Sequence, residues 1–129
     1  AQRVGVEKYI IFTGKQRLDE IPKFLAAADI AVTPKFMEMG EANLKILTYM
    51  AMGLPTVCFG YVYNKQILQD SGLTTKPGDA KEFADAILKL LVDPRRKKVM
   101  GQRARFITQN EYSWLSTARK LVEIYDEVI

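Results

Sequence analysis

Residues 30–60, IAVTPKFMEMGEANLKILTYMAMGLPTVCFG, decide the fold of this chain. The segments IAVTP (30–34) and PTVCFG (55–60) are short apolar runs bounded by proline or glycine, which is typical of buried strands. Between them, residues 42–52 form a helix-like run that ends at Gly53, where glycine commonly terminates a helix. A strand, a helix and a second strand in this order predict a βαβ unit with parallel strands and a right-handed crossover.

The same alternation continues on both sides of this unit. Further strands are predicted at 9–14 and 73–77, and further helices at 17–29, 64–72, 78–94, 95–110 and 112–129. Asn64 and Ser113 are expected to cap the helices that they begin, and Gly101 is a weak point within its helix. The pattern predicts one α/β domain over residues 1–129, with a Rossmann-like parallel sheet of about four strands and flanking helices.

Composition narrows the chemistry that this domain can perform. Apolar residues make up 48% of the chain and charged residues 26%, as in a soluble globular protein, and no apolar run is long enough to cross a bilayer. The sequence has no histidine, which removes the commonest general base and metal ligand. The single cysteine, Cys58, lies in an apolar run and is expected to be a buried thiol, which fits a reducing, cytoplasmic compartment.

The loop at 35–43 leads from the carboxyl end of a strand to the start of a helix, where ligands bind in sheets of this type. Unpaired amides at a helix start bind phosphate groups, and an acid such as Glu41 can bond a sugar hydroxyl. The alternative is that Glu41 and Asn43 serve only to cap the helix. The residues alone favour capping, because most junctions between a strand and a helix are structural.

A series of short motifs, in order from residue 9 to the end, resembles a known enzyme family. The motifs are IIFTG, LAAADIAVTPK, GEANLKILTYMAMGLPTVCF, LTTKPGDAKEFADAILKLL and YSWLSTARKLVEIY. Together they resemble the carboxyl-terminal half of a GT-B retaining glycosyltransferase of group 1, also called family four. The resemblance implies that the domain binds a nucleoside diphosphate sugar, and that neither a metal nor another cofactor is needed.

The resemblance also implies a role for individual positions. It places the nucleobase at Gly14 and Lys15, and the diphosphate or donor sugar at the amides of Ala42, Asn43 and Leu44. From the residues themselves, Gly40, Ala42 and Asn43 at the entrance of the helix are expected to let a diphosphate approach the backbone. Glu41 and Thr48 correspond to the paired acids of the family motif.

Glu41 lies one position from the first glutamate of that motif and is the candidate catalytic residue. The second glutamate, which holds the ribose hydroxyls in the family, is replaced here by Thr48. A threonine hydroxyl can still form a hydrogen bond, but it lacks the charge and the reach of a glutamate. A second departure is Gln66, where many relatives carry an acid.

The family's carboxyl-terminal domain normally begins with two further strands, which carry an arginine and a lysine for the diphosphate. In the family's sheet, these two strands lie in space between the strands predicted at 9–14 and 30–34. Because they are missing, the chain is predicted to be a fragment of a transferase or a degenerate relative. A missing amino-terminal region or a second copy of the chain is expected to cover the sheet edge. The fragment alone is expected to be inactive. The alternative is a non-catalytic interaction module that keeps the fold and has lost the donor site.

Residues 94–106, PRRKKVMGQRARF, hold six basic residues. A solvated helix face is the simplest explanation of such a run. Peripheral contact with an anionic membrane is a second explanation. The run does not favour nucleic acid as a partner, because it lacks interleaved stacking aromatics and any known nucleic-acid motif.

Overall fold

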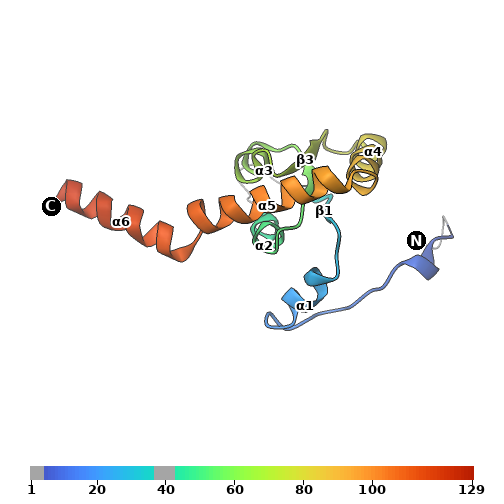
Figure 1. Cartoon of the computed structure of the whole chain (residues 1–129), viewed down its shortest axis with the longest axis horizontal. Coiled ribbons are helices and arrows are strands. Elements are labelled where there is room, and N and C mark those ends of the chain that lie inside the picture. Colours follow the sequence, from blue (N-terminus) through green and yellow to red (C-terminus); the bar gives the residue numbers. More distant parts are fainter. Residues whose placement is uncertain (1–4, 37–42) are drawn as a thin grey trace.

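The computed structural model describes residues 5–36 and 43–129. Its elements follow the chain in the order shown in Figure 1. They are a short 3-10 helix η2 (Glu7–Tyr9), α1 (Ile21–Ala26), β1 (Ala31–Thr33), α2 (Lys45–Ala51), β2 (Thr56–Phe59), α3 (Val62–Leu68), β3 (Gly72–Thr75), α4 (Ala80–Leu91), α5 (Pro94–Glu111) and α6 (Trp114–Val128).

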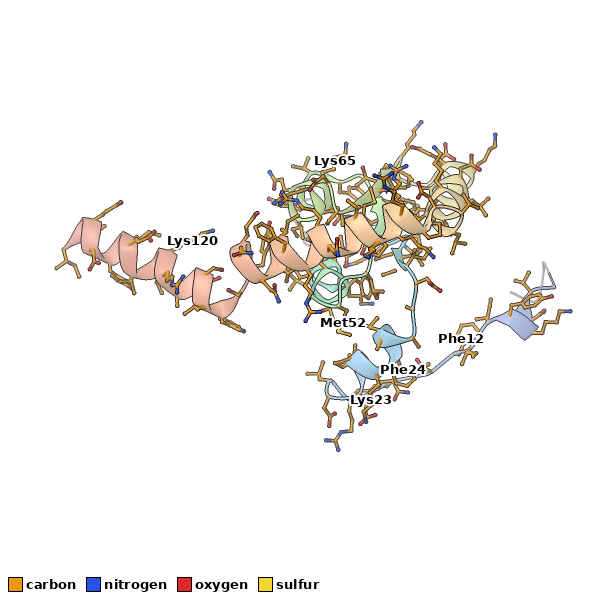
Figure 2. All side chains as sticks on the ribbon, in the orientation of Figure 1. Phe12, Lys23, Phe24, Met52, Lys65 and Lys120 are labelled. Atoms are coloured by element: carbon orange, nitrogen blue, oxygen red, sulfur yellow. The ribbon has the colours of Figure 1, made fainter. Side chains whose placement is uncertain are left out.

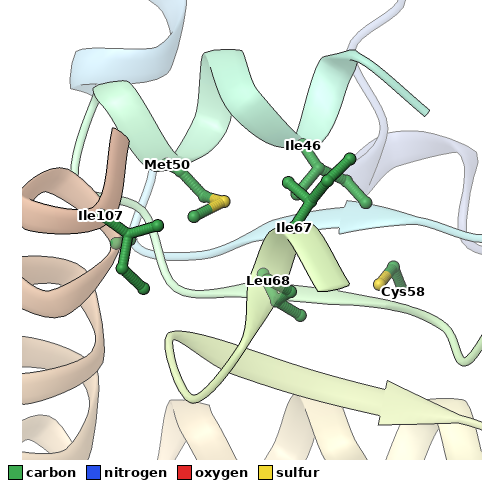
Figure 3. Close-up of a cluster of buried hydrophobic side chains, with 7 residues drawn as sticks. Ile46, Met50, Cys58, Ile67, Leu68 and Ile107 are labelled. Atoms are coloured by element: carbon green, nitrogen blue, oxygen red, sulfur yellow. The ribbon is translucent and has the colours of Figure 1, made fainter. Parts of the chain in front are cut away.

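The sheet is parallel and has the strand order β1-β2-β3, which confirms the predicted α/β class. All four residues of β2 are buried, as expected for a strand covered on both faces. Cys58 faces one layer, where it meets Ile46 and Met50 of α2 and residues of α3 and α5 (Figure 3). Val57 and Phe59 face the other layer, where they pack with α4.

The prediction of a strand over residues 9–14 is wrong. The segment forms η2 and then continues without regular structure, with Ile11 89% exposed and Phe12 85% exposed. Figure 2 labels Phe12 on this extended segment. A strand needs a neighbour for its amide and carbonyl groups, and this segment lies apart from the sheet in Figure 1. The described sheet therefore has three strands, with β1 at one edge and β3 at the other.

Several helix boundaries also differ from the predicted ones. Asn64 does not cap α3, which begins two residues earlier at Val62. It is fully buried instead, and its Nδ2 donates a hydrogen bond of 2.8 Å to the carbonyl oxygen of Phe59. Ser113 does cap α6, because its side chain accepts a hydrogen bond from the amide of Ser116. The helix predicted at 95–110 is confirmed as α5, which runs unbroken through Gly101.

The last helix, α6, extends away from the sheet layers (Figure 1). None of its residues is buried, and Trp114 at its start is 91% exposed. Its apolar residues recur at helical spacing, at positions 114, 118, 121, 125 and 128. Within the described part of the chain, this apolar face has no covering layer.

Candidate functional site

A cavity of about 380 Å³ lies between α2 and the segment that carries α1. Its lining residues are Thr13, Gly14, Gln16, Ile21, Phe24, Leu25, Lys45, Thr48 and Tyr49. Gly14 and Thr48 were both predicted from the sequence to lie at a donor site. The structure therefore places these two residues, which are far apart along the chain, in the lining of one hollow.

The two walls of this cavity differ in chemistry. Ile21, Phe24 and Leu25 of α1 supply an apolar wall. Lys45 and Thr48 lie three residues apart on α2, so they share a face of that helix and supply a cationic and a hydroxyl group. A hollow with one apolar wall and a few polar groups suits a ligand that joins a flat ring to a charged group.

The helix α2 holds its polar residues over the cavity because its opposite face is anchored in the core. Ile46 and Met50 are fully buried and pack into the layer that contains Cys58 (Figure 3). Lys45 and Thr48 are exposed on the other face. Lys45 was not predicted as a site residue. Its spacing of three residues before Thr48 was the available signal, because residues at this spacing share a helix face.

Asn43 is only 3% exposed, and its Nδ2 donates a hydrogen bond of 2.8 Å to Oγ1 of Thr33. Since Thr33 is the last residue of β1, this bond fixes the end of the strand to the entrance of α2. The residue that caps α2 is Leu44, and no side chain caps it with a hydrogen bond. Capping by the Asn43 side chain is therefore wrong, because the cap position is Leu44 and no side-chain oxygen of the described residues accepts a hydrogen bond from the first amides of α2.

The other predicted site residues have different outcomes. Gly14 adopts a left-handed backbone conformation, with φ of 65°, in the turn before α1. Lys15, which follows it, is exposed and is not among the described residues that line the cavity. The predicted residues Gly40, Glu41 and Ala42 lie outside the described residues.

A second hollow, of about 310 Å³, lies at the carboxyl ends of β1 and β2 and is almost wholly apolar. Its lining residues are Pro34, Phe36, Phe59, Gly78, Ala80, Phe83, Ala84 and Ile87. The rings of Phe36 and Phe59 are 5.1 Å apart between centroids, and those of Phe59 and Phe83 are 5.4 Å apart. The sequence did not predict this hollow, because its residues come from three separate segments of the chain.

The thiol of Cys58 is expected to be unreactive in this fold. Burial raises the pKa of its thiol from 9.0 to about 12, so the nucleophilic thiolate is scarce at neutral pH.

Among the described residues, no group of three or more histidine, cysteine, aspartate or glutamate side chains is arranged to hold a metal ion. No helix in the described ranges combines the length and apolar character that a membrane span requires.

Known glycosyltransferases are similar to this chain along nearly its whole length. The D-inositol 3-phosphate glycosyltransferase of Corynebacterium aurimucosum is 30% identical over 131 residues, which cover 100% of this chain and 30% of that protein. The GDP-mannose-dependent alpha-(1-6)-phosphatidylinositol monomannoside mannosyltransferase of Mycobacterium tuberculosis is 27% identical over 130 residues, which cover 95% and 34%. This chain thus spans about a third of the length of these curated relatives.

A solved structure shares the same fold. The sucrose-phosphate synthase of Thermosynechococcus elongatus superposes with a TM-score of 0.87 and 23% identity, over 98% of this chain and 32% of that one. The three-stranded sheet and its helices therefore match part of a GT-B glycosyltransferase. The model of the family described as "Glycosyl transferases group 1" matches residues 1–93, which is most of the chain, so the chain belongs to this family.

Proposed function

We propose that this chain is the donor-binding portion of a glycosyltransferase, and that the cavity between α1 and α2 holds part of a nucleoside diphosphate sugar. The observation that carries the proposal is the joint presence of Gly14 and Thr48 in the lining of that cavity. Family membership supports the reaction class, and one relative is named as dependent on GDP-mannose. The cavity, with one apolar and one cationic wall, suits the two chemical ends of a nucleotide.

Each wall takes one part of the donor in this proposal. The nucleobase lies near Gly14 and against the apolar side chains of α1, among which Phe24 offers a ring for stacking. The hydroxyl of Thr48 bonds the ribose. Lys45 supplies positive charge to the diphosphate, together with the amides of Asn43 and Leu44.

The chemistry follows from where negative charge develops. When the glycosidic bond to the diphosphate breaks, charge accumulates on the leaving phosphate oxygens. Groups that bind this charge more strongly in the transition state than in the ground state accelerate the reaction. Lys45 is suited to this role, and Glu41 is the residue that we propose to act at the donor sugar.

Transfer of sugar is a property that we assign to the longer enzyme. The acceptor and further diphosphate ligands are expected on parts of the protein beyond these 129 residues. In the proposal, the isolated chain binds the donor and does not turn it over. Rapid transfer by the purified 129-residue chain would contradict this division of labour.

Calorimetric titration of the chain with uridine and guanosine diphosphates tests the proposal. We expect saturable binding in the millimolar range or tighter to at least one of them. Glu41→Ala and Lys45→Met should each weaken it, whereas Glu127→Ala and Lys120→Met on α6 should not. The Lys45→Met effect should grow from nucleoside to monophosphate to diphosphate, since the contact is with phosphate.

The replacement of an acid by Thr48 favours a second function, that of a non-catalytic module that keeps the fold. The same titration separates the two functions. Absence of binding to every nucleoside diphosphate, by a chain that melts cooperatively, supports the module. Binding that Lys45→Met weakens supports the donor site.

A further inference from the structure

The outward face of α5 carries pairs of residues seven positions apart, which places the two members of each pair on the same side of the helix, two turns apart. Val99 and Phe106 form an apolar pair, and they are 58% and 55% exposed. Lys98 and Arg105 form a basic pair beside them. Arg96 and Arg103 form a second basic pair on the other side.

This face is strongly cationic. No acidic residue occurs between residues 94 and 110. Two of the cations in the run are engaged within the fold: Lys97 with Asp29 at 3.4 Å, and Arg103 with Asp70 at 2.8 Å.

The other cations of the run are exposed to solvent. Arg95, Arg96, Lys98 and Arg105 are exposed, and the structure gives none of them an ion pair to a described residue. The surface formed by these four cations with Val99 and Phe106 is called the α5 surface below.

We propose that the α5 surface docks on an anionic lipid membrane. Its cations complement negatively charged headgroups, while Val99 and Phe106 reach the boundary between headgroups and acyl chains. Lys and Arg side chains that flank an apolar stripe have this arrangement in helices that lie flat on a membrane. The position of α5 along the outside of the sheet layers leaves the face accessible in the described structure (Figure 1).

The apolar pair distinguishes a membrane from a nucleic acid as the partner. A nucleic acid is bound by phosphate contacts and by aromatic rings free to stack on bases. Here Val99 offers no such ring. The ring of Phe106 already faces the guanidinium of Arg103, which lies 5.6 Å from the ring centroid. Exposed aliphatic surface at the centre of a basic face gains free energy in lipid and gains little against a phosphate backbone.

Vesicle flotation with the 129-residue chain tests this inference, which does not depend on the proposed donor site. We expect binding to phosphatidylcholine vesicles that contain about a third phosphatidylserine, weak binding to pure phosphatidylcholine, and loss of binding as salt is raised. Equal binding to both vesicle types would overturn the inference. Binding to a labelled oligonucleotide without binding to anionic vesicles would also overturn it.

Variants locate the contact. Lys98→Glu with Arg105→Glu should lower partition onto the anionic vesicles by about tenfold or more. The matched control, Lys81→Glu with Lys120→Glu, makes the same change in net charge at exposed positions on α4 and α6 and should lower it far less. Phe106→Ser should weaken binding to the anionic vesicles at low salt without changing net charge, because it removes the apolar contribution. Equal losses in the α5 and control variants would show a response to net charge alone and would refute a specific surface. Circular dichroism melts confirm that each variant is folded.

Discussion

Gly101 of α5 packs with its backbone directly against the carbonyl group of Gly53, the glycine that follows α2. A Cβ atom at position 101 would collide with the Gly53 oxygen and would reach 3.7 Å from Cδ of Pro55. Gly53 itself has φ of 72°, a left-handed conformation in which glycine is favoured. The contact lets α2 and α5 approach closely, and α2 is the helix that carries the polar wall of the cavity.

Gly101→Ala is therefore expected to destabilise the chain, although alanine is the better helix former. Overpacking against backbone costs about 1–3 kcal/mol, and the gain in helix propensity is about 1 kcal/mol. Urea unfolding should show a lower midpoint for Gly101→Ala, with little change for the exposed Gln102→Ala on the same helix. A midpoint that is unchanged or raised would show that the two helices separate without loss.

The bond between Asn43 and Thr33 yields a second prediction. Asn43→Leu leaves the buried Thr33 hydroxyl without this partner, and a buried polar group that loses its partner costs about 1–3 kcal/mol. Unfolding of Asn43→Leu, Thr33→Val and the double variant should give a favourable coupling energy between the two sites. Strictly additive effects would show that the bond contributes nothing to holding α2 on β1.

Cys58 gives a prediction for alkaline pH. Its pKa is raised by burial to about 12 in the fold, from 9.0 for an unperturbed thiol. The unfolded chain therefore loses its thiol proton first, so the stability from the neutral thiol is complete below about pH 9 and is lost as the pH rises toward 12. Stability should fall less steeply over this range in Cys58→Ala than in the parent chain. Parallel slopes from chemical unfolding would contradict a buried, neutral thiol.

Thr48→Glu restores the acid that the family resemblance assigns to the ribose. If the ribose lies beside Thr48, a charged hydrogen-bond acceptor there should strengthen nucleoside diphosphate binding by roughly 1.5 kcal/mol, which is about tenfold in affinity. Thr48→Gln should give a smaller gain, and a deoxyribose analogue should abolish the advantage of glutamate. An unchanged affinity for the ribonucleotide would show that the ribose does not lie beside Thr48.

The sequence predicted those parts of the fold that depend on local chemistry. The βαβ pattern around Gly53, the burial of Cys58 and the cap at Ser113 each follow from neighbouring residues, and the structure confirms them. The strand at 9–14 failed because strand formation depends on a pairing partner, and local β propensity does not supply one.

The candidate site was predictable only in outline. The resemblance assigned Gly14 and Thr48 to a donor site, but the cavity that they share depends on how α1 lies against α2. The cap considered at Asn43 failed because α2 is capped at Leu44, and the Asn43 side chain instead donates to a threonine on β1. Lys45 was missed because no motif marks a lysine at that position and its spacing from Thr48 shows only that the two share a helix face. Tertiary packing decides each of these three cases.

The central claim is that the cavity between α1 and α2 binds the nucleotide of the donor, and site-resolved NMR titration tests it most directly. On addition of uridine or guanosine diphosphate, the amide resonances of Gly14 and Thr48 should shift together, with one saturable binding curve. The backbone amide resonances of α6, which lies apart from the α1 and α2 segments, should not shift. Saturable shifts that leave both Gly14 and Thr48 unmoved, or no shifts with either nucleotide, would contradict the account.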